Sequence, residues 1–299
     1  MHEILLYYKY THIADPGEFC HTQKLLCEKL GLKGRIIIAP EGINGTVEGL
    51  TENTQKYIDE TTRDPRFADM NFKHSVGTSN AFPKLSVKAR SEIVSAHLGK
   101  EDVNPAITTG KYLSPEMLHD WIHSNKEFYI VDMRNDYEHS VGFFKNSILP
   151  PLKNFRDLPK ILPELAYLKN KTVVTVCTGG VRCEKASGFL VEHGFNDVYQ
   201  LHNGIVSYME KYPDEDFAGK LYVFDGRVTM AFSNPKREHE IVGRCRKCNT
   251  PNENFVNCLL PTCHDHFICC VNCLNKKGEP FCSWRCALIQ KFKLIVLVK

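Results

Sequence analysis

The segment VVTVCTGGVRCEKASGFL, residues 173–190, decides the fold of the central part of the chain. Its first residues are β-branched and mostly apolar, which is typical of a fully buried strand, and the stretch from Glu184 to Gly194 predicts a helix. Two adjacent glycines between them allow a tight turn. Because reactive groups in open α/β sheets lie beyond the carboxyl ends of the strands, we expect Cys177 at such an edge.

The turn after this strand predicts a reactive thiolate. Backbone amides of a glycine-rich turn converge on one point, and the following helix adds the positive end of its dipole. A cysteine beside them should have a lowered pKa and act as a nucleophile, accessible from solvent. A buried structural cysteine is the alternative, since free cysteine is among the most buried residue types. The glycines and the arginine favour the reactive interpretation for the loop Cys177, Thr178, Gly179, Gly180, Val181 and Arg182.

Two residues at the end of this loop have open roles. Arg182 either completes the ring of donors or contacts an anionic ligand. Cys183 follows it directly, and is either a resolving thiol for an oxidised or persulfidated Cys177 or the first buried residue of the helix. The spacing makes both interpretations of Cys183 acceptable.

Strands and helices alternate on both sides of the loop. Helical patterns at 114–124, 157–168 and 205–212 alternate with strand patterns at 127–134, 171–177 and 197–201. This alternation predicts a parallel sheet covered by helices on both faces, which we place at residues 106–216.

The preceding segment has a different order. Strand patterns at 2–10, 34–49, 72–76 and 84–94 surround helical patterns at 18–31 and 51–67. A β-α-β-β-α-β order predicts a ferredoxin-like α+β domain, also described as acylphosphatase-like, over residues 1–98. Residues 99–110 are a polar linker, and 217–240 are a connector with one more strand, 220–230.

The C-terminal segment, residues 241–299, is rich in cysteine. Nine of the 13 cysteines lie between Cys245 and Cys286, mostly as closely spaced pairs. In a reducing compartment such pairs favour metal over disulfides, and eight thiolates suit two tetrahedral Zn²⁺ sites. Cys269 is left over, and His264 or His266 could replace a thiolate. The expected ligands are Cys245, Cys248, Cys258, Cys263, Cys270, Cys273, Cys282 and Cys286, with reduced or redox-active cysteines as the alternative.

Composition excludes several classes of protein. With 42% hydrophobic and 24% charged residues, the chain is an ordinary globular protein and not a disordered one. It has neither a stretch long enough to cross a bilayer nor the features of a signal peptide, so we expect a cytoplasmic protein without membrane association. The apolar end FKLIVLVK, residues 292–299, is an edge strand, a packed tail or a frayed end.

The net charge of +3 does not by itself indicate nucleic-acid binding.

Several motifs resemble one family. Cys177 to Arg182 resembles the six-residue active-site loop of rhodanese domains, and Asp132, Arg134 and Glu138 stand where such domains have an Asp-x-Arg strand end and an acidic helix. With four residues between the cysteine and the arginine, the loop suits a persulfide sulfur better than a phosphate. The segments IIIAPEGINGTVEG, FPKLSVKARSEIV, CTGGVRCEKASG and YVFDGRV, in this order, resemble the bacterial rhodanese-domain tRNA uridine hydroxylases.

This resemblance implies a function. It implies oxygen-dependent 5-hydroxylation of the wobble uridine in the tRNA anticodon loop, an essential Cys177, and molecular oxygen as co-substrate. No organic cofactor or protein partner is evident. Lys84, Lys88 and Arg90 alternate along one strand and could contact RNA phosphates, although solvated charge is the simpler interpretation. The alternatives are a persulfide-carrying sulfurtransferase and a non-catalytic, zinc-bearing interaction protein.

Overall fold

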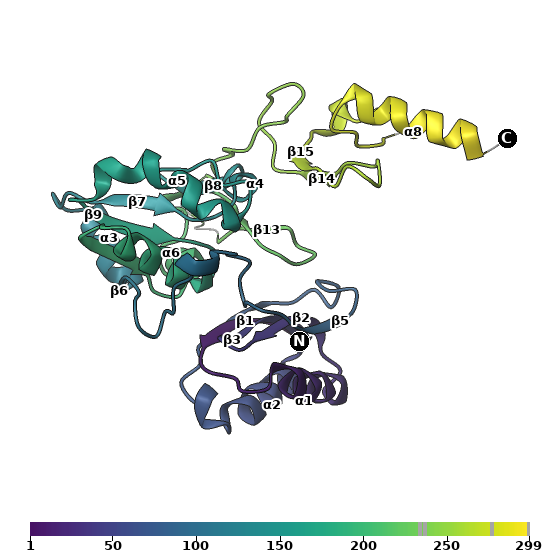
Figure 1. Ribbon diagram of the computed structural model, residues 1–299. Coiled ribbons are helices and arrows are strands. Elements are labelled where there is room, and N and C mark those ends of the chain that lie inside the picture. Colours follow the sequence, from purple (N-terminus) through teal and green to yellow (C-terminus); the bar gives the residue numbers. More distant parts are fainter. Residues whose placement is uncertain (233–234, 236–237, 276–277, 298–299) are drawn as a thin grey trace.

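The computed structural model describes residues 1–232, 235, 238–275 and 278–297. Figure 1 shows three regions in chain order, with the cysteine-rich segment extending away from the other two. Among the described residues, no helix is both long and apolar enough to cross a membrane.

The N-terminal region is one mostly antiparallel sheet with two helices on one face. Strands β1 (His2–Tyr10), β2 (Lys33–Ala39), β3 (Gly42–Leu50), β4 (Phe72–Val76) and β5 (Leu85–Ala89) form it in the order β4-β1-β3-β2-β5. Helices α1 (Pro16–Lys29) and α2 (Thr51–Thr62) lie on the side away from the central region (Figure 1). The prediction of a ferredoxin-like domain is confirmed. β5 extends it as an edge strand parallel to β2.

Alternation along β1 gives the N-terminal sheet two different faces. Leu5 and Tyr7 are buried in the core that the helices cover. Residues two apart point to the same face of a strand, so Leu6, Tyr8 and Tyr10 project from the opposite face. That uncovered face meets the central region, where Leu6 packs against a core cluster.

The central region is a parallel sheet with helices on both faces, as predicted. Strands β6 (Lys111–Leu113), β7 (Tyr129–Asp132), β9 (Thr172–Val176) and β10 (Asp197–Leu201) pair in the order β6-β10-β9-β7. Helices α3 (Pro115–Ile122) and α7 (Gly204–Lys211) contribute to one core cluster, and α5 (Leu158–Leu165) and α6 (Val181–Glu192) to the other. Helix α4 (Asp136–His139) follows β7, and β8 (Gly142–Phe144) pairs with β11 (Phe217–Gly219).

The remaining elements are short strands and one C-terminal helix. Where we predicted one strand at 220–230, the chain forms two, β12 (Leu221–Tyr222) and β13 (Thr229–Met230), which pair with each other. That prediction was wrong because Asp225 and Arg227 form an ion pair within a turn that reverses the chain. In the cysteine-rich segment β14 (Phe255–Asn257) pairs with β15 (His266–Ile268). The described part of the apolar C-terminal stretch belongs to helix α8 (Trp284–Leu297), so an edge strand there is excluded; residues 298–299 lie outside the described part.

Candidate active site

Cys177 lies directly after β9, at the carboxyl end of the central sheet, as the sequence predicts. The loop then turns into α6, which begins at Val181. Gly180 has φ +99°, a left-handed conformation that residues with a side chain rarely adopt. Gly204, at the start of α7, packs on the other side of the loop. A Cβ there would lie 2.6 Å from the amide nitrogen of Gly180 and 2.7 Å from the carbonyl oxygen of Cys177. Both glycines are therefore required by the loop geometry.

The Cys177 sulfur lies among hydrogen-bond donors. The amide of Gly180 donates to it over 3.3 Å. Burial alone would raise the pKa of this thiol. A hydrogen bond from the Cys183 thiol, the positive charge of Arg182 and the amides of Cys183 and Arg182 outweigh burial and lower the pKa to about 6. These donors and the arginine charge therefore favour the thiolate form of Cys177.

Cys183 is fully buried next to Cys177, on the first turn of α6. Its amide donates to the carbonyl oxygen of Gly180 over 2.9 Å. Burial, together with the hydrogen bond to the Cys177 sulfur, raises the pKa of Cys183 well above its ordinary value. The pair therefore consists of one thiolate and one thiol, and both cysteines are free. The two roles considered for Cys183 both remain predictions.

Arg182 has a partner that we did not predict. Its guanidinium forms two hydrogen bonds with the buried carboxylate of Glu138 in α4, at 2.5 and 2.8 Å. Burial would lower the pKa of Arg182, but the negative charge of Glu138 outweighs it and raises the pKa. The neighbouring pair Asp132 and Arg134 is also buried, and Arg134 donates to the carbonyl oxygen of Gly142 over 2.7 Å. Because Glu138 balances most of the Arg182 charge, the loop holds less net positive charge than its sequence, with one arginine and no acidic residue, indicates.

The expectation that Cys177 is accessible was wrong for this conformation. Its exposed fraction is 0%. The strand β1 of the N-terminal domain lies against the outer side of this loop. A Cβ on Gly179 would lie 3.0 Å from a methyl carbon of Leu6, and one on Gly180 would lie 2.9 Å from the hydroxyl of Tyr8. This cover comes from residues about 170 positions away, which the motif alone does not reveal.

β1 is held in this position by hydrogen bonds to α6. The Tyr8 hydroxyl donates to the carboxylate of Glu184 over 3.0 Å, and the Tyr10 hydroxyl donates to the carbonyl oxygen of Val181 over 3.2 Å. Burial and the charge of Glu184 raise the pKa of Tyr8, so its hydroxyl keeps the proton that it donates. The N-terminal domain is thus part of the wall around the loop.

Lys73 in β4 is a buried cation next to this cover. It pairs with Leu6 in the sheet register, and its Nζ lies 5.2 Å from the centre of the Tyr8 ring. The side chain is 7% exposed, and its Nζ has no hydrogen-bond partner within the described structure. Burial lowers the pKa of Lys73 to about 8, although the charges of Cys177, Glu210 and Glu184 partly oppose this. An unpaired buried amine is costly, which makes it a marker of a functional site.

A cleft of about 380 Å³ is lined by residues of both the N-terminal sheet and the loop. Thr178, Gly179, Val181 and Arg182 form its wall on the side of the central domain. The rest of the lining contains aromatic rings and guanidinium groups, contributed by Tyr8, Phe82, Phe155, Phe224, Arg35 and Arg156. Cys177 lies behind this wall.

A larger groove, of about 1270 Å³, shares part of this lining. Arg35, Phe82 and Phe224 border both spaces. Its remaining walls come from the N-terminal and central domains, the connector and the cysteine-rich segment, and include the basic residues Lys33, Lys153, Arg244 and Arg246. The described structure thus brings all three regions to one concave surface next to the cleft.

The three basic residues predicted for RNA contact lie elsewhere. Lys84, Lys88 and Arg90 are exposed, and alternate with Leu85 and Val87, which pack on the core. They therefore share one face along the edge strand, as their spacing indicates, but none of them lines the cleft or the groove. Their contact with RNA remains a prediction. Arg35, one strand further in, lines both spaces and was missed.

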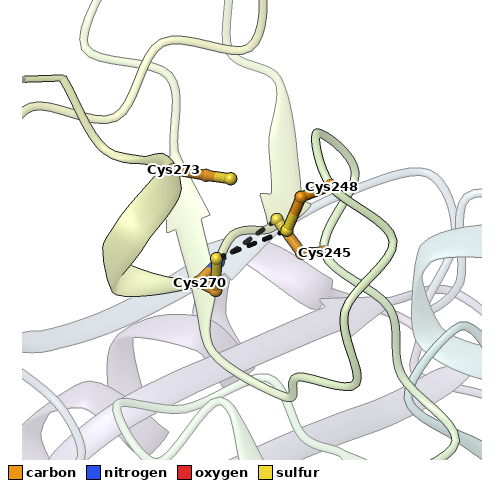
Figure 2. A group of neighbouring side chains, drawn as sticks. All are labelled: Cys245, Cys248, Cys270 and Cys273. Atoms are coloured by element: carbon orange, nitrogen blue, oxygen red, sulfur yellow. Dashed lines mark hydrogen bonds between the residues drawn. The ribbon is translucent and has the colours of Figure 1, made fainter.

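The eight predicted metal ligands form two groups of four. Cys245, Cys248, Cys270 and Cys273 converge from two segments of the chain in Figure 2, and the second group is Cys258, Cys263, Cys282 and Cys286. The four pairs of cysteines therefore alternate between the groups in chain order. This pairing, which the spacing left open, explains why the segment folds as one unit: each group joins parts of the chain on both sides of the other.

Sulfur separations agree with metal coordination. Cys248 and Cys270 lie 3.6 Å apart, and Cys263, Cys282 and Cys286 lie 3.4 to 3.7 Å from one another. A disulfide requires about 2.05 Å. Four thiolates around a tetrahedral Zn²⁺ with bonds of about 2.3 Å lie about 3.8 Å apart. The two groups can therefore hold metal ions.

Three further residues considered for metal binding are outside both groups. Cys269 is buried and left over, as expected. His266 instead contacts the Tyr222 hydroxyl and the Asn257 side chain, and His264 lines the groove. The alternative in which a histidine replaces one of the thiolate ligands is therefore wrong for the described structure.

The residues that the sequence missed come mainly from the N-terminal domain. Tyr8 and Lys73 belong to ordinary strand patterns. The sequence held one signal for Lys73. Side chains alternate between the two faces along the strand FKHSV, so pairing this strand with β1 places Lys73 on the same face as the apolar Leu6. Glu138 was identified by its place in the motif, but not as the partner of Arg182.

Family models match along most of the chain. Residues 2–93 match the UPF0176 acylphosphatase like domain, residues 114–211 the Rhodanese-like domain, and residues 218–287 the model described as Rhodanase C-terminal. The boundaries that we placed at 98, 106, 216 and 241 stay predictions.

Curated relatives match over nearly the whole length. A tRNA uridine(34) hydroxylase from Cytophaga hutchinsonii is 45% identical over 285 residues, covering 95% of this chain and 89% of that protein. Relatives of the same name from Bacillus cytotoxicus and Bacillus mycoides are 45% and 42% identical and cover 90% and 99% of this chain, and 82% and 92% of their own lengths. Identity at this level over this length, together with the loop geometry, shows that the chain belongs to the tRNA uridine(34) hydroxylase family.

Proposed function

We infer that this protein hydroxylates C5 of the wobble uridine of tRNA in a reaction that consumes O₂, with Cys177 as the catalytic thiolate. The name of the relatives supports the substrate and the reaction. One structural observation carries the role of the cysteine: its loop, with the pKa of Cys177 lowered to about 6, forms a wall of a cleft that two domains share. We place the reaction in the cytoplasm, where tRNA is modified.

The lining of the cleft suits a nucleobase. RNA bases that are splayed out of a loop stack on aromatic rings and on guanidinium planes, and phosphates pair with arginine. Phe82, Phe155 and Phe224 offer rings, and Arg35 and Arg156 offer guanidinium groups. We propose that the wobble base enters this cleft while the rest of the anticodon loop lies in the adjoining groove, which has five basic residues against three acidic ones.

Access to Cys177 requires the N-terminal domain to move as a unit, because β1 is an inner strand that pairs with both β3 and β4. The contacts between this domain and the central domain include the hydrogen bonds of Tyr8 and Tyr10, the packing of Leu6 and the ion pair of Lys185 with Glu41. RNA that binds both domains would supply the free energy for this movement. We propose that the cover protects the thiolate from oxidation until RNA occupies the cleft.

The thiolate has a chemical role that fits the reaction. Its addition to C6 of uracil would move negative charge onto C5 and the O4 oxygen, and C5 would then react with O₂. The charge needs a cation, and Arg182 is already paired with Glu138. Lys73, whose Nζ is unpaired, is the cation that we propose to balance the anion in the loop.

The electron balance assigns a role to Cys183. Insertion of one oxygen atom of O₂ into the C5–H bond releases the other as water, which consumes two electrons and two protons. Once Cys177 has left C6 as a thiolate, oxidation of this thiolate and the Cys183 thiol to a disulfide supplies both electrons and one proton, and water supplies the second proton. An external thiol then reduces the disulfide. The contact between the two sulfur atoms supports this proposal.

Nucleoside analysis of tRNA tests the function directly. We expect 5-hydroxyuridine to disappear from the tRNA of a deletion strain and to return with the wild-type gene but not with Cys177→Ser. Cys27→Ser, at a buried cysteine of the N-terminal domain, is a matched control that should restore it. Full restoration by Cys177→Ser would exclude the catalytic role. A purified protein that transfers sulfur from thiosulfate to cyanide at high turnover, with normal tRNA in the deletion strain, would favour the sulfurtransferase.

We further propose that the two cysteine groups hold structural Zn²⁺. The donor set of four thiolates, the sulfur separations and the small apolar core of this segment support it. Metal analysis of untagged protein should give at least two zinc ions per chain, and less than one would contradict the proposal.

A further inference from the structure

A third group of metal-ligating side chains lies on the central domain, outside the cysteine-rich segment. It consists of His119 and His123 on α3, with Glu215 and Asp216 in the segment between α7 and β11. One ligand atom of each residue lies within 4.8 Å of the others. The group thus joins two parts of the chain that are more than 90 residues apart.

The two histidines have the spacing of ligands on one helix face. Residues four apart in a helix lie one above the other, so both imidazoles reach the same point. His119 Nε2 lies 3.0 Å from a carboxylate oxygen of Glu215, and His123 Nε2 lies 3.2 Å from one of Asp216. Nitrogen and oxygen ligands at about 2.0 to 2.1 Å from a tetrahedral ion are about 3.3 to 3.4 Å apart, so coordination requires only small side-chain movements.

Charge also favours a cation here. The two carboxylates bring two negative charges, and Asp216 is mostly buried. Within the described residues, neither carboxylate forms an ion pair with lysine or arginine: the Lys145 amine reaches the carbonyl oxygen of Glu215 instead. Two neutral imidazoles and a divalent ion would make the group electrically neutral.

The ligands are held in place by neighbouring rings. The Tyr208 hydroxyl donates to Oδ2 of Asp216, which His123 also contacts; an outer hydrogen bond of this kind is typical of metal-bound carboxylates. His119 stacks on the Tyr212 ring, with centres 3.9 Å apart and planes 10° from parallel. The amide of Lys145 donates to the carbonyl oxygen of Asp216 over 2.9 Å, where the chain enters β11. Both ends of the group are therefore positioned before any ion binds.

We propose that His119, His123, Glu215 and Asp216 bind one divalent transition-metal ion of the zinc class. Two imidazoles and two carboxylates suit Zn²⁺ and Co²⁺. The ion would fasten α3 to the segment that leads from α7 into β11, and so stabilise the end of the central domain. Without an ion, the same residues form two pairs of a histidine with a carboxylate.

Co²⁺ is the probe that separates this site from the cysteine groups. Thiolate ligands give Co²⁺ an intense charge-transfer absorption, whereas nitrogen and oxygen ligands give only weak visible bands. The full-length protein, stripped of metal and titrated with Co²⁺, should bind one equivalent that adds weak bands without thiolate absorption. His119→Gln with His123→Gln should remove that equivalent and leave thiolate absorption unchanged. Asp120→Asn, an exposed change on the same helix, should retain it.

The possible outcomes test this site independently of whether the cysteine groups bind zinc. If the wild type binds only ions with thiolate absorption, or the double variant keeps the additional equivalent, the proposal is overturned. If the cysteine groups bind nothing, the weak bands and their loss in the double variant would still support it. Should the double variant misfold by circular dichroism, Glu215→Gln alone, at a partly exposed position, should weaken Co²⁺ binding at this site at least tenfold. Unchanged affinity in that variant would overturn the proposal.

Discussion

Replacement of Lys73 by methionine should make the protein more stable and less active. The pKa of Lys73 is lowered from 10.5 to about 8 by burial. A difference of 2.5 pKa units, at about 1.4 kcal/mol for each unit, corresponds to about 3 kcal/mol of free energy that opposes folding at pH 7. Methionine has a similar length without the charge, so Lys73→Met should recover an amount of this order.

The pH dependence gives this prediction its sign. The pKa is lower in the folded state than in the unfolded state, so the unfavourable free energy is fully present below pH 8. It disappears as the pH rises through 10.5, because the amine is then neutral in both states. The advantage of Lys73→Met should therefore shrink from about 3 kcal/mol at pH 7 to about 1.5 kcal/mol at pH 9.5.

Urea denaturation followed by circular dichroism at both pH values measures this difference. Lys88→Met, at an exposed lysine of the same domain, is the matched control and should change stability little. The same Lys73→Met protein should hydroxylate tRNA more slowly, with its activity shifted to higher pH, because the thiolate loses a cation; Lys73→Arg should restore part of the rate. A Lys73→Met protein that is no more stable than the wild type at pH 7, or whose advantage does not change with pH, would refute the reasoning.

Four other changes test separate parts of the site. Glu138→Gln should destabilise the protein by about 3 to 5 kcal/mol in denaturant, since it leaves the buried Arg182 charge without its partner; a loss below 1 kcal/mol would contradict this. Gly204→Ala should abolish tRNA hydroxylation, because its Cβ would lie 2.7 Å from the Cys177 carbonyl oxygen; retained activity would show that the loop adapts. Arg35→Ala should weaken tRNA binding and reduce by about one the slope of log affinity against log salt, and an unchanged slope would remove Arg35 from the phosphate interface. Chelation of metal should make residues 245–286 sensitive to protease while residues 1–216 stay resistant, and uniform resistance would contradict a structural metal.

The fold was largely predictable because local patterns determine it. Alternation along HEILLYYKY and the apolar run before Cys177 specify strands of two different kinds, and both sheets formed as expected. The loop was predictable for the same reason, since its glycines follow the strand directly. Errors occurred where a short turn competes with a strand, as at Asp225 and Arg227.

The surroundings of the loop were not predictable in the same way. Tyr8 and Lys73 lie near the Cys177 loop only because one face of the N-terminal sheet packs on the central domain. Nothing in their local sequence specifies that packing. Likewise, the spacing of cysteines indicated eight ligands, but their division into two groups depends on how β14 and β15 bring distant pairs together.

Ionisation of Cys177 can be measured while the side chain stays buried. In protein labelled with ¹³C at the cysteine Cβ, the signal that Cys177→Ser removes reports the charge of this sulfur as pH varies. We predict a midpoint near pH 6 for the wild type. A midpoint at the ordinary thiol value of about 8.5 would contradict the claim that the loop holds a thiolate at neutral pH.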